Sequence, residues 1–225
     1  MHLIPTPTKL EIKSGFYYFD KEPEVKKIID ACALFKLNKF HFHLTHDQGL
    51  RFEMEKYPLL TEVGSKRRAS EFSREENDQN EYAHYYTKSE LKEIVEYCHE
   101  RYIEVIPEFD IPGHTTSLIA AYPELSCRGE SIETKTKGGV FDDILCVGNE
   151  ETLKVIYAVI DEMCEIFTDK YFHIGGDEAP KTCWIKCSEC RKKKEELGLK
   201  DFQELQGWLM NEVSEYLKKK GKTAI

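Results

Sequence analysis

Long apolar runs are missing from this sequence, and so is a basic start. No stretch of the 225 residues stays apolar for the roughly 20 positions that a membrane-spanning helix needs. Residues 1–7 contain no basic segment followed by an apolar core, so we do not interpret them as a signal peptide. These absences predict a cytoplasmic protein that has no membrane partner.

Positive charge is also scarce. The sequence has 41 Asp and Glu residues against 32 Lys and Arg residues, which gives a formal net charge of -9 and a pI near 5.5. An acidic surface repels the phosphates of nucleic acids and of anionic lipids. The composition therefore argues against a nucleic-acid partner and again against a membrane partner.

A second Cys-x-x-Cys pair is absent. Eight cysteines in a chain without a signal peptide are expected to be reduced thiols. Cys183, Cys187 and Cys190 lie close enough in sequence to suggest zinc, but zinc usually needs four ligands, and only Cys187 and Cys190 form a Cys-x-x-Cys pair. We therefore favour surface thiols over structural zinc, and we predict no metal and no cofactor.

Two histidines alternate with aromatic residues in one predicted strand. Residues 39–44 place Phe40, Phe42 and Leu44 on one face, and His41 and His43 on the other. Histidines two residues apart can bind zinc or can pack inside a protein. No third ligand follows in a metal-binding pattern, so packing is the favoured interpretation.

Helix-like and strand-like segments alternate along the chain. Apolar residues at three- and four-residue steps predict helices at 22–36, after a capping box at 87–90, at 150–167 and at 201–220. Strands are predicted at 39–44, 103–110 and 171–174, with a strand-like segment at 9–13 and the start of another strand at 222. Residues 61–86 are polar and are interpreted as a long solvated loop.

This alternation predicts an α/β fold of the (β/α)8 TIM-barrel type. A complete barrel of that type usually needs about 250 residues. The chain is therefore expected to form a partial, roughly half barrel. Such a barrel exposes strand edges, through which copies of the chain are expected to self-associate.

The strongest chemical signal is a pair of adjacent acids after a short apolar strand. Residues 171–174 lead into Gly175 and Gly176, and then into Asp177 and Glu178. Neighbouring side chains point to opposite faces of a strand, so both acids can serve one site only where the strand ends and the backbone turns. The alternative is a helix that Asp177 caps and that has Glu178 in its first turn.

The stretch His-Ile-Gly-Gly-Asp-Glu at 173–178 resembles the active-site motif of glycoside hydrolase family 20, the β-N-acetylhexosaminidases. The segment at 43–51 resembles a family loop with two acids followed by Gln-Gly-Trp-Arg, and Pro112-Gly113-His114 resembles the family's Pro-Gly-His. The resemblance covers residues 22–225. It implies a (β/α)8 barrel, with residues 1–20 as a lead-in similar to the start of the family's small N-terminal domain and residues 21–225 as a partial catalytic barrel.

The resemblance also implies roles for individual residues. Glu178 is expected to act as general acid and then as base. Asp177 is expected to hold the 2-acetamido group of the substrate, whose oxygen attacks the anomeric carbon, so that hydrolysis retains the configuration. His114 is expected to support Glu178. The expected substrate-binding residues are Asp47, Asp110 and Trp184, although Trp184 could instead pack within its loop.

Two positions depart from the family pattern. His46 occupies the place of the first acid in the family loop, and Leu50 occupies the place of the tryptophan. In the family the first acid helps to set the protonation of the catalytic pair, and Asp47 is expected to take over part of that role. The expected partners are glycans that contain N-acetylglucosamine or N-acetylgalactosamine.

Two other functions compete with this interpretation. One is a truncated, inactive homologue with weak or no glycan binding, which the departures at His46 and Leu50 favour. The other is a metal-dependent hydrolase that uses His41, His43, Asp177 and Glu178.

Overall fold

Parallel strands form the centre of the structure. The computed structural model describes residues 10–12, 22–71 and 77–225. One parallel sheet has the order β1-β2-β9, and a second parallel pair joins β10 to β11. The strands are β1 (Leu10–Ile12), β2 (Lys39–His43), β9 (Glu104–Glu108), β10 (Tyr171–Phe172) and β11 (Thr223–Ala224). All five coincide with strands or strand-like segments predicted from the sequence.

A bridge joins the two parallel groups into one row. Glu108 pairs with His173 in parallel. The His173 N–H donates to the Pro107 carbonyl at 2.9 Å, and the Phe109 N–H donates to the His173 carbonyl at 3.0 Å. The five strands therefore follow one another in space in the same order as in the sequence, which is the succession that repeated βα units produce.

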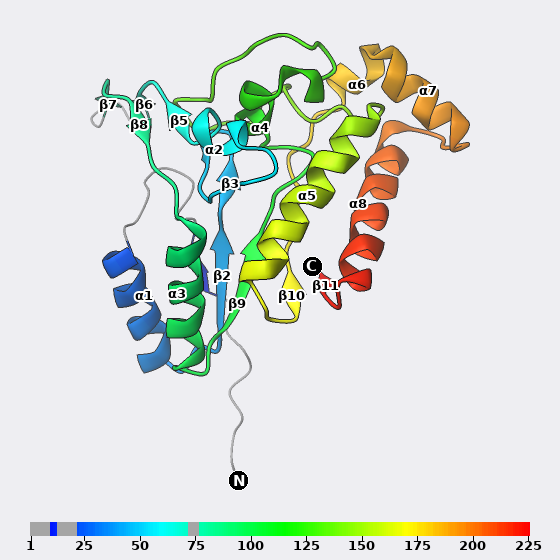
Figure 1. Ribbon diagram of the computed structural model, residues 1–225. Helices are drawn as coiled ribbons and strands as arrows, with labels where there is room; N and C mark the ends of the chain where they lie inside the picture. Colours follow the sequence, from blue (N-terminus) through cyan, green and yellow to red (C-terminus); the bar gives the residue numbers. More distant parts are fainter. Residues whose placement is uncertain (1–9, 13–21, 72–76) are drawn as a thin grey trace.

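Four long helices connect these strands and lie alongside them (Figure 1). They are α1 (Glu22–Leu34), α3 (Lys88–His99), α5 (Glu150–Ile166) and α8 (Phe202–Lys219). The predicted capping box is present: Thr87 Oγ1 accepts from the Glu90 N–H at 3.2 Å, and the Glu90 carboxylate accepts from the Thr87 N–H at 2.7 Å. Each predicted helix is confirmed to within two residues at its ends, apart from α3, for which only the start was predicted.

Strand β2 is buried on both of its faces. Phe40, Phe42 and Leu44 have no exposed surface, as their alternation predicted. His41 and His43 on the opposite face are only 1% and 4% exposed. Burial of both faces is typical of parallel sheets in α/β proteins. The two buried histidine rings therefore need polar partners, because burying a polar group without one is costly.

The shorter elements gather where the parallel strands end (Figure 1). They are β3 (Thr45–His46), β4 (Gly49–Leu50), α2 (Leu59–Glu62), β5 (Lys66–Arg67), β6 (Ser70–Glu71), β7 (Asn77–Asp78), β8 (Tyr82–Ala83), α4 (Thr116–Ala121), the 3-10 helix η1 (Pro123–Leu125), α6 (Thr182–Lys186) and α7 (Ser188–Glu196). No helix among the described residues combines the length and the apolarity needed to cross a bilayer.

The interpretation of residues 61–86 as a solvated loop is wrong in part. Ser65 and Arg67 are 2% and 1% exposed. The reason is Arg51, whose guanidinium is fully buried and donates to the carbonyls of Ser65 at 2.6 Å, His84 at 2.8 Å and Gln48 at 2.7 Å. Burial lowers the pKa of Arg51 to about 9. This single side chain ties both ends of the polar segment to the β3–β4 turn.

Candidate active site

The two adjacent acids lie where the chain leaves β10. Residues 175–181 are not helical, and the next helix, α6, begins at Thr182. The backbone turns through two glycines with positive φ, Gly175 at 64° and Gly176 at 107°, and then through Glu178 at 43°. The alternative of a helix that Asp177 caps is therefore wrong. The left-handed turn is what frees two neighbouring carboxylates from opposite strand faces.

Gly175 is required at its position for a second reason. A Cβ atom there would lie 1.8 Å from Oδ1 of Asp110. The backbone after β10 therefore passes directly over the Asp110 carboxylate, which accepts the N–H of Gly176 at 3.2 Å. This contact holds the acid-bearing turn against the end of β9.

His114 connects the acid pair to the protein interior. Its Nε2 lies 3.2 Å from Oε2 of Glu178, and its Nδ1 lies 2.9 Å from Oδ2 of Asp47. The other oxygen of Asp47 accepts the N–H of Thr116 at 3.0 Å and the Thr116 hydroxyl at 2.5 Å. His114 is 6% exposed and Asp47 is 1% exposed, whereas the Glu178 side chain is 54% exposed. The linked side chains of Asp47, His114 and Glu178 therefore lead from the interior to the surface.

The carboxyl groups around His114 favour the charged form of its imidazole. Burial lowers the pKa of His114, but the hydrogen bond to Asp47 and the charge of Asp47 outweigh it and raise that pKa to about 9. Burial raises the pKa of Asp47, but the contact with His114 outweighs it and the net pKa is lowered. At neutral pH His114 is then a cation, so that both ring nitrogens can donate, Nδ1 to the Asp47 carboxylate and Nε2 to the carboxyl group of Glu178.

Asp177 reaches the same imidazole from another direction. The carboxylates of Asp110 and Asp177 and the ring of His114 have nitrogen or oxygen atoms that all lie within 4.8 Å of one another. Burial raises the pKa of Asp110 to about 7, and the nearby charge of Asp177 adds to that rise. Asp177 and Glu178 therefore converge on His114, and both are exposed to solvent.

His46, at the position of the family's first acid, packs on His114. The two rings stack with their centroids 4.2 Å apart, and Nδ1 of His46 lies 2.8 Å from Oε1 of Gln48. Burial lowers the pKa of His46 to about 3, so the ring is neutral at neutral pH. A neutral ring covers the face of His114 without competing for the charge of Asp47. The sequence indicated the substitution at His46 but gave no signal for this stacking.

Glu108 accounts for the paired histidines of β2. Its carboxylate lies 2.6 Å from Nε2 of His41, 2.9 Å from Nδ1 of His43 and 3.1 Å from Nδ1 of His173. Burial opposes ionisation, but these contacts lower the pKa of Glu108.

The metal-dependent hydrolase requires the two β2 histidines to meet the acid pair. Among the described residues, the groups close enough to share an ion combine His41 with Glu108 and His173, and His43 with His46 and Asp110. No such group brings either histidine together with Asp177 or Glu178. The geometry therefore does not support this alternative.

Trp184 cannot offer its ring to a sugar. The side chain has no exposed surface, and its indole N–H donates to the Leu145 carbonyl at 2.8 Å. The substrate-binding prediction for Trp184 is therefore corrected to the alternative, packing within the loop. Asp47 and Asp110 are each 1% exposed and hold His114 and Gly176, which favours positioning roles over direct contact with a ligand.

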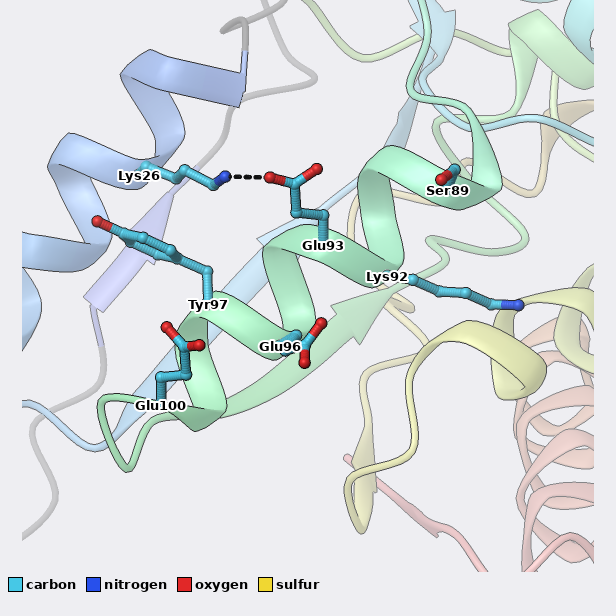
Figure 2. A pocket seen from close by; sticks show the side chains of 7 residues that line it. All are labelled: Lys26, Ser89, Lys92, Glu93, Glu96, Tyr97 and Glu100. Carbon is cyan, nitrogen blue, oxygen red and sulfur yellow. Dashed lines mark hydrogen bonds and ion pairs between the residues drawn. The ribbon is translucent and has the colours of Figure 1, made fainter.

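A polar pocket elsewhere is distinct from this site. It has a volume of about 560 Å³ and is lined by Lys26 of α1, by five side chains of α3 and by Glu100 just after that helix. A Lys26–Glu93 ion pair of 2.6 Å lies at its edge (Figure 2). None of the residues that meet at His114 lines it. The pocket belongs to the outer helical layer, whereas the acids lie at the carboxyl ends of the strands.

Fold and site together define a parallel α/β protein in which carboxyl groups and an imidazole meet at the carboxyl ends of the strands. The sequence profile of the glycosyl hydrolase family 20 catalytic domain matches residues 16–225. The chain belongs to this family.

Known proteins resemble the chain over nearly all of its length. It is 43% identical to a beta-hexosaminidase of Porphyromonas gingivalis, in an alignment that covers 92% of this chain and 26% of that protein. A beta-N-acetylhexosaminidase crystal structure superposes with a TM-score of 0.87 at 37% identity and covers 92% of this chain and 44% of that one. An exo beta-N-acetylglucosaminidase of Vibrio harveyi, solved in complex with N-acetylglucosamine, gives a TM-score of 0.82 at 31% identity and covers 95% and 34%. The chain thus spans less than half the length of these relatives.

Proposed function

We propose that the chain carries the acid–base site of a β-N-acetylhexosaminidase, which removes terminal N-acetylhexosamine residues from glycans with retention of configuration. The observation that carries this proposal is the convergence of Asp177 and Glu178 on His114. The similarity of the chain to beta-hexosaminidases, and to a structure in complex with N-acetylglucosamine, supports the choice of substrate class.

Glu178 is the proposed general acid and base. Its half-exposed carboxyl group can reach the glycosidic oxygen of a substrate, while His114 holds its position from behind. In the first step Glu178 gives its proton to the leaving oxygen as the glycosidic bond breaks. In the second step it accepts a proton from the water that attacks the anomeric carbon, while the bond that the acetamido oxygen has formed to that carbon breaks.

Asp177 is the proposed partner of the substrate's 2-acetamido group. The acetamido oxygen attacks the anomeric carbon and forms an oxazolinium ion, so no enzyme nucleophile is needed. Asp177 accepts the acetamido N–H and stabilises the positive charge that develops. Attack by a group on the same sugar is effectively unimolecular, which accounts for much of the acceleration.

The proposed scaffold is a partial (β/α)8 barrel over residues 21–225, with residues 1–20 as a lead-in. Support comes from five parallel strands that follow chain order, with their site at the carboxyl ends. In that scaffold β1 and β11 are edge strands, so self-association through them is expected. Most of residues 1–20 lie outside the described residues, so their interpretation as a lead-in stays a prediction. The cytoplasmic location and the absence of nucleic-acid partners also stay predictions.

The test compares two leaving groups. Replacing Glu178 by Gln keeps the size of the side chain and removes its proton. Hydrolysis of a β-linked N-acetylglucosamine disaccharide, which needs protonation of a poor leaving group, should fall on the order of 10²- to 10⁴-fold. Hydrolysis of 4-nitrophenyl N-acetyl-β-glucosaminide should fall much less, because nitrophenolate leaves without a proton.

The matched control is Glu212→Gln on the exposed face of α8, which should leave both rates unchanged. Equal losses on both substrates in Glu178→Gln would contradict the role as general acid. If the chain is instead a truncated, inactive homologue, the unmodified chain should hydrolyse neither substrate and should bind N-acetylglucosamine weakly or not at all.

A further inference from the structure

Four cysteines from separate segments meet at one point beside the active-site loops. Their thiol sulfurs all lie within 4.8 Å of one another. Cys127 follows η1, Cys146 lies before α5, Cys187 separates α6 from α7, and Cys190 lies in the first turn of α7. We call these residues the four-cysteine cluster.

The spacing of the sulfurs matches that of a tetrahedral metal site. Sulfur atoms are 3.7 Å apart between Cys127 and Cys190, 3.6 Å between Cys146 and Cys190, and 3.8 Å between Cys146 and Cys187. Four ligands at the usual Zn–S distance of about 2.3 Å form a tetrahedron with edges of about 3.8 Å. We propose that the four-cysteine cluster binds one structural zinc ion.

The fold brings the two halves of the cluster together through backbone contacts. Ser126 and Leu145 form an antiparallel bridge, and the Cys146 N–H donates to the Leu125 carbonyl at 2.7 Å. These contacts place Cys127 and Cys146 side by side although 18 residues separate them in the sequence. Cys127 and Cys146 thus supply the two further ligands that Cys187 and Cys190 need for a four-coordinate metal site.

Gly148 lets this paired loop approach α7. A Cβ atom at Gly148 would lie 2.4 Å from the backbone nitrogen of Cys190. A larger residue would therefore push Cys146 away from Cys187 and Cys190. Close backbone approach of this kind is a common reason for a glycine next to a binding site.

Cysteine binds metal as the thiolate, so zinc binding at the four-cysteine cluster releases the thiol protons. Cys146 and Cys190 are buried, and the other two are half-buried.

The site is structural because the protein supplies all four ligands and leaves no position for a substrate. It joins the connection between β9 and α5 to the helices α6 and α7, which follow Glu178 within a few residues. A zinc ion here would fix the loop that begins at the acid pair. This inference adds to the proposed glycosidase function and does not depend on it.

Cys183 provides a matched control. It lies in the short helix α6, one turn before Cys187, but its sulfur faces Nη2 of Arg128 at 3.6 Å and does not belong to the cluster. A serine at Cys183 changes the same type of residue in the same loop. It should leave the zinc content unchanged, whereas Cys190→Ser and Cys127→Ser should remove it.

The experiment measures metal content of the full chain, purified in reductant with zinc supplied. We expect about one zinc per chain for the unmodified protein and for Cys183→Ser, and loss of most of it for Cys127→Ser, whose half-buried side chain leaves the core intact. Replacing zinc by Co²⁺ in the unmodified protein should give the strong visible absorption of tetrahedral cobalt–thiolate sites.

Three results would overturn the proposal. They are a chain that stays metal-free in excess zinc, a zinc content that Cys127→Ser leaves unchanged, and a mass under non-reducing conditions that shows disulfides among these four cysteines in freshly purified protein. All three measurements are independent of glycosidase activity, so a failed enzyme assay would not affect them. The unmodified chain alone decides the first and third, even if a variant does not fold.

Discussion

Removing the charge of Asp47 should change the protonation of His114 more than removing that of Glu178. Asp47 is buried and lies 2.9 Å from Nδ1 of His114, and this contact is what raises the pKa of the imidazole to about 9. In Asp47→Asn, burial should dominate, and we expect that pKa to fall below about 7. A fall of about two pH units corresponds to about 3 kcal/mol of interaction between the two groups.

The same interaction predicts how stability depends on pH. A histidine whose pKa is raised on folding contributes stability that is fully present below about pH 6.5 and is lost as pH rises through about 9. Asp47, whose pKa is lowered, contributes stability above about pH 4 that is lost as pH falls. The difference in unfolding free energy between the unmodified chain and Asp47→Asn should therefore be largest between about pH 4 and 6.5.

The assay is a titration of the imidazole resonances by NMR, with urea unfolding at several pH values beside it. Glu178→Gln is the control, because Glu178 contacts the same ring but its side chain is 54% exposed and water screens its charge. It should lower the pKa of His114 much less than Asp47→Asn does. A His114 midpoint that stays near 9 in Asp47→Asn would refute this account of the site.

Three further predictions concern the surrounding structure. Gly175→Ala should lower the unfolding free energy by about 3 kcal/mol or more, because its Cβ would collide with Asp110. Gly198→Ala, where φ is 67° and the space around the residue is free, should cost only about 1 kcal/mol. Urea unfolding measures both costs, and equal values would contradict the close contact at Gly175. Trp184→Phe should lower the unfolding free energy by about 1 kcal/mol, because the hydrogen bond to the Leu145 carbonyl is lost. The KM for an N-acetyl-β-glucosaminide should stay unchanged, and a large rise in KM would indicate that Trp184 binds the substrate. The stability that Asp110→Asn gains over the unmodified chain should be larger at pH 8 than at pH 5. An acid whose pKa is raised on folding to about 7 destabilises the fold increasingly as pH rises from about 4 to about 7, and the amide does not ionise. An equal difference in unfolding free energy at the two pH values would contradict this prediction.

Local patterns determined much of the fold and could be read from the sequence. The helices have apolar stripes and capping residues within a few positions, as at Thr87–Glu90 and at Asp201, which caps α8. The short strands have apolar runs bounded by turn residues. Two glycines before Asp177 and Glu178 also predicted the turn that brings two neighbouring acids to one site, and the structure has that turn.

Contacts between distant segments could not be read in this way. Cys127 and Cys146 join Cys187 and Cys190 through a bridge and a close backbone approach, neither of which leaves a local pattern, so the cysteines looked like isolated thiols. The burial of Trp184 depends on the carbonyl of Leu145, nearly forty residues earlier in the sequence. Arg51 binds carbonyls on both sides of a polar segment that by composition alone looked solvated.

The central claim is that Asp177 and Glu178 act together on one N-acetylhexosamine. The most direct measurement compares kcat/KM for 4-nitrophenyl N-acetyl-β-glucosaminide and 4-nitrophenyl β-glucoside, using protein that carries this chain. Assistance by the acetamido group predicts a preference on the order of 10³-fold or more for the first substrate, and most of that preference should disappear in Asp177→Asn. Equal rates on the two substrates, or a preference that Asp177→Asn leaves intact, would contradict the claim.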